Sequence, residues 1–244
     1  MYLRAKSLKE HLNDYVVLYN KLQDYRSKKV LFSILNNWYQ FDFNTLNISM
    51  ERNYDHYFDL DLIKCDEKEV FVDLGSYTGD TISSYLNTYG IDCYSKIYGY
   101  EVTKESFEAS KKELKYFPNI YLNNKAVSNK NEVLYFNYSE VDNSANQVLE
   151  DGSEKVDAVS IDEDILDDIT MIKMDIEGYE EKALEGCKKH IEKEHPKLLI
   201  SVYHNHEDLY KIPKMIYQID PSYQFYLRYY GNNIFPTETV LIAI

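Results

Sequence analysis

The sequence is poor in cysteine and glycine and contains no long apolar run. Its 244 residues include only 3 Cys, 8 Gly, 5 Pro and 1 Trp. Cys65, Cys93 and Cys187 lie far apart with no CxxC spacing, which argues against a disulfide framework and a zinc cluster. No segment approaches the roughly 20 apolar residues of a membrane span, and the N-terminus lacks the apolar core of a signal peptide. We therefore expect a soluble, cytoplasmic protein.

Positive charge is also scarce. The chain has 27 Lys and Arg against 41 Asp and Glu, a formal net charge of −14. Such a balance argues against nucleic acid or an anionic membrane as the main partner, because the long-range attraction has the wrong sign. We interpret the acidic residues 150–168 as a solvated loop with helix-end carboxylates. The 25 tyrosines could stack on sugars, although the accompanying Asn, Lys and Ile favour a composition bias.

Hydrophobic periodicity divides the chain in two. From Leu8 to Trp38 apolar residues recur at three- and four-residue intervals, which predicts amphipathic helices. Residues 1–65 are therefore predicted to be a helical appendage, either a cap on the site or a dimerisation segment. Residues 66–244 are predicted to be the core domain, since strand and helix patterns alternate there as in βαβ units.

The predicted core elements define an α/β fold. We expect five strands at 70–74, 96–101, 120–123, 170–175 and 197–203, with helices at 80–89, 104–117, 179–194 and 207–219, and an extra strand-like run at 132–137. Two final strands, 223–229 and 238–244, flank Gly231-Asn232-Asn233 and predict an antiparallel C-terminal hairpin. The fold class is a doubly wound, mostly parallel, seven-stranded Rossmann-like sheet.

The first turn, within VFVDLGSYTGDT, predicts a ligand site. Gly75 permits a backbone conformation closed to other residues, and Gly79 allows close approach at the start of a helix. Backbone N–H groups at such a helix start can meet a nucleotide-like ligand. The spacing alone is only moderately specific, because any doubly wound domain can carry a glycine there.

Two further strand ends narrow the choice of ligand. Glu101 ends the second strand, KIYGYE, where a carboxylate can accept both hydroxyls of an adenosine ribose. NAD and S-adenosylmethionine both present such a ribose, but Tyr77 stands where the second glycine of GxGxxG would cradle a pyrophosphate. Asp175 ends the strand in ITMIKMDIEGYEEKAL, at the carboxyl edge where open α/β sheets bind ligands.

Together these motifs resemble those of FkbM-type, class I S-adenosylmethionine-dependent methyltransferases. The resemblance covers about residues 68–244 and is carried by VDLGSYTGD, YGYE, NKAVS, SIDE and IKMDIEGYE. It implies S-adenosyl-L-methionine as the cofactor and S-adenosyl-L-homocysteine as the product. It also implies that the following residues bind the cofactor: Asp73, Gly75, Ser76, Tyr77, Gly79, Asp80, Thr81 and Asp175 near the methionine part, Glu101 at the ribose, and Val102, Lys125 and Ala126 at the adenine.

Methyl transfer to a hydroxyl needs alignment and removal of a proton. Asp175 and His204, which follows the strand 197–203, are the candidate bases. Tyr203, His206 and Arg228 are the candidate substrate-binding residues. The imidazoles of His204 and His206, with Asp208 and Asp175, could alternatively hold a divalent metal. A helix starting at His206 would break that geometry, so we predict no metal.

The sequence thus predicts an O-methyltransferase that acts on a sugar hydroxyl of a surface glycan or nucleotide-sugar precursor. The carbohydrate rests on the resemblance and the tyrosine richness. The alternatives are a nicotinamide-dependent oxidoreductase on the same fold and a catalytically inactive adenosine-cofactor-binding module. We expect a small-molecule or glycan partner, no nucleic acid and no membrane insertion. A homodimer is a possible assembly.

Overall fold

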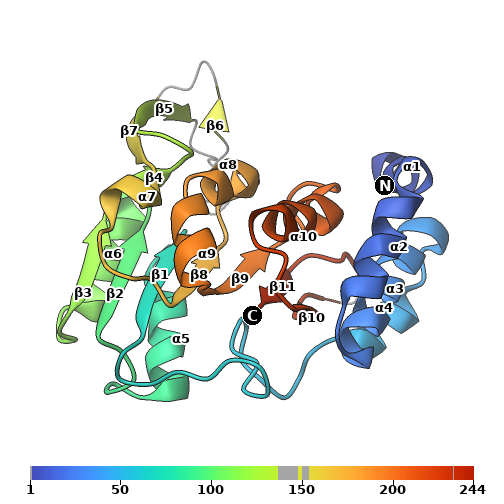
Figure 1. Ribbon diagram of the computed structural model, residues 1–244, viewed down its shortest axis with the longest axis horizontal. Coiled ribbons are helices and arrows are strands. Elements are labelled where there is room, and N and C mark those ends of the chain that lie inside the picture. Colours follow the sequence, from blue (N-terminus) through green and yellow to red (C-terminus); the bar gives the residue numbers. More distant parts are fainter. Residues whose placement is uncertain (1, 137–147, 150–153, 233) are drawn as a thin grey trace. The chain divides into compact units, whose positions relative to one another are not determined.

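The computed structural model describes residues 2–136, 148–149, 154–232 and 234–244 and confirms the predicted α/β fold (Figure 1). Its main sheet has seven strands in the order β10-β11-β9-β8-β1-β2-β3. These strands are β1 (Val70–Leu74), β2 (Lys96–Tyr100), β3 (Ile120–Asn123), β8 (Met171–Met174), β9 (Lys197–Ser201), β10 (Phe225–Tyr229) and β11 (Thr239–Ala243). The chain groups into two compact units, residues 58–196 and residues 1–57 with 197–244. The predicted boundary at residue 65 differs from this division, in which residues 197–244 group with residues 1–57.

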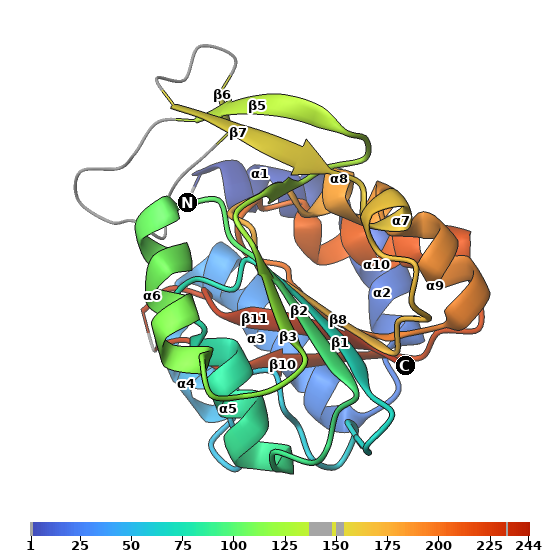
Figure 2. The same cartoon turned by 90° about the vertical axis from the view of Figure 1, so that its left-hand side faces the viewer.

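The unit of residues 58–196 contains the parallel strands. β1 pairs in parallel with β2 and β8, and β2 with β3. Figure 2 shows α5 (Asp80–Tyr89) and α6 (Lys104–Leu114) on one side of these strands and α8 (Glu180–Glu185) and α9 (Lys188–Glu194) on the other. Every residue of β1 is buried, as expected for a strand covered on both faces. The carboxyl ends of β1, β2 and β8 therefore meet at one edge.

The predicted helix at 179–194 is two helices, because the helix is interrupted at Gly186-Cys187 between α8 and α9. A Cβ on Gly186 would lie 2.1 Å from the carbonyl oxygen of Ser128, so only glycine allows this approach. The carboxylate of Asp162 accepts the backbone N–H groups of Lys189 and His190, with its closest oxygen 2.9 Å from the Lys189 nitrogen. The break thus exposes a second helix start, which Asp162 caps.

A smaller sheet corrects the interpretation of residues 150–168 as a solvated loop. It has the order β4-β7-β5-β6, made of β4 (Ala126–Val127), β5 (Glu132–Phe136), β6 (Val148–Leu149) and β7 (Glu154–Val159). Val156 and Ala158 of β7 are buried, while Lys155 and Asp157, which alternate with them, are exposed. This alternation is typical of a strand with one solvated face. The short helix α7 (Ile161–Asp164) follows, whereas residues 150–153 lie outside the described residues.

The unit of residues 1–57 and 197–244 combines helices with the antiparallel strands. Its helices are α1 (Tyr2–Glu10), α2 (Leu12–Lys21), α3 (Tyr25–Gln40), α4 (Phe43–Ser49) and α10 (Asp208–Ile219). The predicted helical periodicity near the N-terminus and the predicted C-terminal hairpin are both confirmed, since β11 pairs antiparallel with β10 and β9. Asp24 caps α3 by accepting the N–H of Ser27 at 2.7 Å. Helix α3 packs on β10.

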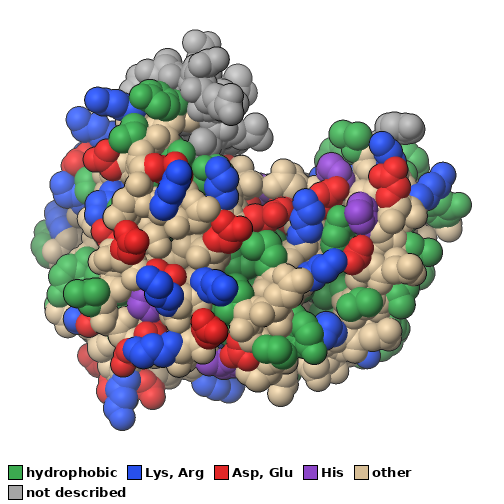
Figure 3. Space-filling view, turned by 45° about the horizontal axis from the view of Figure 1, so that its top comes forward, with side chains coloured by type: hydrophobic (Ala, Val, Ile, Leu, Met, Phe, Trp, Pro, Cys, Tyr) green, Lys and Arg blue, Asp and Glu red, His purple; other side chains and the backbone are tan. Residues whose placement is uncertain are grey.

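The surface charge and the character of the helices concern the predictions about nucleic acid and membranes. On the face of the molecule in Figure 3, Lys and Arg side chains lie among Asp and Glu side chains rather than in one broad patch. Among the described residues, no helix combines the length and apolar character needed to cross a membrane.

Candidate functional site

The glycine turn between β1 and α5 is built on the ends of two neighbouring strands. The N–H groups of Gly75 and Ser76 both donate to the carbonyl of Tyr100, at 3.0 and 2.9 Å. Gly75 has a φ of +80°, and a Cβ there would lie 1.9 Å from the carbonyl oxygen of Asp175. The turn therefore requires glycine for its conformation and for its contact with the end of β8.

The second glycine of the turn has a packing role that the sequence did not reveal. Gly79 has a φ of +85° and precedes the first residue of α5. A Cβ at this position would lie 2.9 Å from a methyl group of Leu114 on α6. Close helix packing, as well as ligand approach, thus restricts position 79. Asp80 and Thr81 follow in the first turn of α5, where Asp80 is exposed and Thr81 is buried.

Glu101 links the glycine turn to the end of β2. One oxygen of its carboxylate accepts the N–H of Tyr77 at 2.9 Å, and the other accepts the N–H of Thr103 at 2.7 Å. Burial raises the pKa of Glu101, although these two N–H groups and Lys173 oppose the shift. Tyr77 has a φ of +43° and a 41% exposed side chain. Glu101 therefore fixes an unusual backbone conformation beside the predicted ribose position.

Lys173, which the sequence analysis did not select, forms a buried ion pair at the same edge. Its Nζ lies 2.9 Å from Oδ1 of Asp73 and donates to the carbonyl oxygen of Gly75 at 2.7 Å. Burial raises the pKa of Asp73 to about 6, since desolvation outweighs the attraction of Lys173. Burial by itself lowers the pKa of Lys173, but Asp73, Asp175 and Asp80 outweigh it and raise that pKa overall. A lysine within the apolar strand run MIKM was the available signal.

A second turn follows β8 and completes the edge. Asp175 is half-buried, and its N–H donates to the carbonyl of Leu74 at 3.0 Å. Glu177 and Gly178 have φ values of +56° and +93°. The N–H of Ile176 donates to the fully buried carboxylate of Glu180 at 3.1 Å. The structure therefore brings the predicted residues of the glycine turn, Glu101 and Asp175 together within one unit.

Of the residues predicted at the adenine, Val102 follows Glu101 in the sequence and contacts the segment that contains Ala126. Val102 packs on the small cluster that contains Ala126. The side-chain amide of Asn124 donates to the carbonyls of Glu101 and Val102, at 2.8 and 2.9 Å. The sequence analysis quoted Asn124 only as part of NKAVS and gave it no role. Its amide holds the predicted adenine segment against the end of β2.

Lys125 has a polar partner from the helix that follows β7. Its Nζ donates to one oxygen of Asp164 at 2.8 Å, and the hydroxyl of Tyr100 donates to the other at 2.6 Å. Asp164 thus connects β2 with the segment after β3. The Lys125 side chain is engaged in this network, so its predicted place at the adenine rests on its backbone and aliphatic stem.

Tyr203, His204 and His206 belong to the other unit and follow β9. The rings of Tyr203 and His204 lie 4.2 Å apart between centroids, and the hydroxyl of Tyr203 donates to Glu238 at 3.4 Å. His204 is half-buried. The carboxylate of Asp208 is fully buried and accepts the N–H of Asn205 at 2.8 Å, which fixes this turn. The role of His204 or Asp175 as the base stays a prediction.

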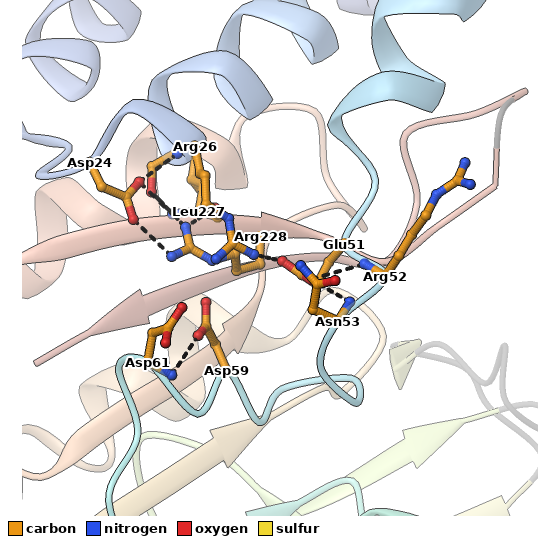
Figure 4. A network of polar contacts seen from close by, with 10 residues as sticks. Asp24, Arg26, Glu51, Arg52, Asn53, Asp59, Asp61, Leu227 and Arg228 are labelled. Carbon is orange, nitrogen blue, oxygen red and sulfur yellow. Dashed lines mark hydrogen bonds and ion pairs between the residues drawn. The ribbon is translucent and has the colours of Figure 1, made fainter.

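Arg228 has a structural environment that does not suit its predicted contact with substrate. The side chain is 2% exposed, and its guanidinium donates to Asp24 at 2.8 Å and to the Ser27 hydroxyl at 3.0 Å (Figure 4). Burial alone would raise the pKa of Asp24, but the bonds from Arg228 and Ser27 outweigh it and lower that pKa. Arg228 therefore attaches α3 to β10, and its contact with the acceptor stays a prediction.

The fold and the strand-end site define a class of protein, the Rossmann-like methyltransferases that bind S-adenosylmethionine. The family model described as the Methyltransferase FkbM domain matches residues 73–231, and the chain belongs to this family. This membership confirms the resemblance seen in the motifs and supports S-adenosyl-L-methionine as the cofactor. No curated protein matches the sequence.

Solved structures of methyltransferases are similar to this chain to different degrees, and the first of them shares its fold. The methyltransferase FkbM of Methylobacillus flagellatus KT superposes with a TM-score of 0.84 at 23% identity, over 98% of this chain and 60% of that one. The chain thus spans less than two thirds of the length of that relative. Aeropyrum pernix fibrillarin with natively bound S-adenosyl-L-methionine has a TM-score of 0.47 at 10% identity, covering 73% of this chain and 67% of that one. A Streptococcus mutans protein solved with SAH has a TM-score of 0.46 at 13% identity, covering 73% and 89%.

Proposed function

We propose that this FkbM-family protein transfers the methyl group of S-adenosyl-L-methionine to a sugar hydroxyl of a surface glycan or nucleotide-sugar precursor. The observation that carries the choice of donor is the charge around the glycine turn. Asp73, Asp80, Asp175 and Glu101 all interact electrostatically with one buried cation, Lys173. Carboxylates in excess favour a cationic ligand, and the methyl donor carries a sulfonium and an ammonium group.

The same charge argues against the nicotinamide alternative. A dinucleotide would bring an anionic pyrophosphate to the glycine turn, where a GxGxxG sequence and free N–H groups normally receive it. Here the N–H of Tyr77 is held by a carboxylate of Glu101. The pyrophosphate would therefore meet a carboxylate instead of an available donor.

Glu101 is suited to the ribose even with its two backbone bonds. Each carboxylate oxygen has two lone-pair sites, and each accepts one backbone N–H in the structure. The side chain of Thr103 takes a further site, and the capacity that remains on the carboxylate suits a ribose hydroxyl. Asn124 fixes the carbonyls of Glu101 and Val102, which supports the adenine side of the same ligand.

The chemical step requires little beyond alignment and a base. S-adenosyl-L-methionine would supply the methyl group: as the C–O bond to the acceptor forms, the C–S bond would break and the sulfur would keep the electron pair, giving S-adenosyl-L-homocysteine. The hydroxyl proton passes to a base. We propose His204 as this base, with Asp175 as the second candidate and Tyr203 and His206 as acceptor contacts.

The sugar acceptor rests on the family resemblance and on tyrosine richness, so it needs a direct test. The purified protein is incubated with S-adenosyl-L-methionine and a panel of nucleotide sugars, and S-adenosyl-L-homocysteine release is measured. Release that depends on one sugar supports the proposal, whereas release with none of the sugars but with a non-carbohydrate hydroxyl compound would replace the sugar. Binding of the cofactor without turnover on any compound would favour the inactive binding module. A cytoplasmic location and a homodimer stay predictions.

A further inference from the structure

Lys173 is a fully enclosed cation that the proposed methyl transfer does not use. It is the third residue of β8 and is 2% exposed, while Asp73 beside it is 0% exposed. The two residues lie directly opposite each other in the parallel register of β1 and β8. Residues paired in this way have side chains on the same face of the sheet, which explains the ion pair.

The ammonium group also reaches beyond the strand into the glycine turn. It donates to the carbonyl oxygen of Gly75 at 2.7 Å. The N–H of Ser76, on the other side of the same peptide bond, donates to the carbonyl of Tyr100 at 2.9 Å. The Gly75–Ser76 peptide is therefore held at both of its polar ends.

The next peptide bond of the turn is held in the same manner. The carbonyl of Ser76 accepts the N–H of Gly79 at 2.7 Å, and the N–H of Tyr77 donates to Glu101 at 2.9 Å. Two successive peptide planes are thus fixed, and Lys173 supplies the only one of these four bonds whose donor is a charged side chain. A turn fixed before the ligand arrives loses less conformational freedom on binding.

We propose that Lys173 is a positioning residue of the cofactor site, which sets the glycine turn for the methionine end of S-adenosyl-L-methionine and acts without contacting the acceptor. The inference rests on the proposed function, because the ligand of the turn is the methyl donor. Lys173 has two effects in this arrangement. It orients the Gly75 carbonyl, and it balances the charge of Asp73 so that both can stay buried.

The test compares Lys173→Met with Lys96→Met. Methionine keeps the length of the side chain and removes the ammonium group. Lys96 is the matched control, since it also forms an ion pair, with Asp167 at 2.7 Å, but begins β2 at the other end of the sheet. Binding of S-adenosyl-L-methionine, S-adenosyl-L-homocysteine and 5′-methylthioadenosine is measured by calorimetry on variants whose circular dichroism shows them folded.

The expected result is a loss confined to ligands that carry the amino-acid part. Lys173→Met should raise the Kd of S-adenosyl-L-methionine and S-adenosyl-L-homocysteine by about tenfold or more, as when a hydrogen bond to a charged group is lost. The Kd of 5′-methylthioadenosine should stay within about twofold of wild type, since Glu101 and Asn124 serve the adenosine end. Lys96→Met should change none of the three.

Three outcomes would overturn the inference. They are unchanged binding of S-adenosyl-L-methionine by folded Lys173→Met, an equal loss for all three ligands, and recovery of binding when both charges are removed. For the third outcome, the double variant Asp73→Asn/Lys173→Met is compared with Asp73→Asn. The same comparison tests the inference if the single Lys173 variant does not fold. Failure of the double variant to fold would assign Lys173 to folding alone. If the wild type itself does not bind S-adenosyl-L-methionine, the proposed function fails first.

Discussion

Gly75→Ala tests whether the glycine turn is packed against the end of β8 as the structure shows. The added Cβ would lie 1.9 Å from the carbonyl oxygen of Asp175, at a φ of +80°. The left-handed conformation costs about 1–2 kcal/mol for a residue with a Cβ. Displacing packed backbone adds about 1–3 kcal/mol. We therefore expect Gly75→Ala to lower the free energy of unfolding by about 2–5 kcal/mol and to weaken S-adenosyl-L-methionine binding.

Gly90→Ala is the matched control for the conformational part of this cost. Gly90 has a φ of +100°, but no heavy atom lies within 4 Å of the position of its added Cβ. The free energy of unfolding of Gly90→Ala should fall by about 1–3 kcal/mol from backbone strain alone, and its affinity for S-adenosyl-L-methionine should be unchanged. Unfolding in urea and calorimetric titration measure the two quantities. Equal stability of the two variants, with cofactor affinity intact in both, would refute the contact between Gly75 and Asp175.

The remaining predictions concern Arg228, His204 and Asp73. Arg228→Met should lower the free energy of unfolding by about 2 kcal/mol, because it removes the buried guanidinium that donates to the half-exposed Asp24, and unchanged stability with lost turnover would support a role in binding substrate. His204→Ala should spare cofactor binding but lower turnover by about 10²-fold or more, and full turnover would leave the proton to Asp175 or to alignment alone. The raised pKa of Asp73 implies a stability contribution that is present below pH 4 and lost as the pH rises through about 6. Unfolding curves of Asp73→Asn should lack this loss, and an unchanged pH dependence would assign it elsewhere.

The elements with a strong hydrophobic period could be predicted almost residue by residue. Strand β1 and helix α5 have the bounds expected for them, since one is apolar except for Asp73 and the other starts directly after Gly79. Strand β7 could not be predicted in this way. Its solvent-facing residues, such as Lys155 and Asp157, belong to an acidic stretch whose charge hides the alternation. Pairing with β5 and β4 provides what the local sequence does not show.

The residues of the site could be predicted only where they belong to a recognisable sequence motif. Gly75, Glu101 and Asp175 stand at strand ends, and parallel strands bring such ends together whatever the intervening loops. The ion pairs of Lys173 and Arg228 were not predictable, because the partner of each, Asp73 or Asp24, lies far away in the sequence. The sequence shows that a charged residue interrupts an apolar run. Only the fold shows which partner balances it.

Titration of the wild-type protein with S-adenosyl-L-methionine and, separately, with NAD tests the central claim most directly. Both ligands contain an adenosine ribose, for which we propose Glu101 as the partner, but one would bring a sulfonium and the other a pyrophosphate to the turn that lies between Asp73 and Asp80. We predict saturable heat with S-adenosyl-L-methionine, no heat with NAD, and no displacement of the first ligand by the second. Binding of NAD without binding of S-adenosyl-L-methionine would contradict the account.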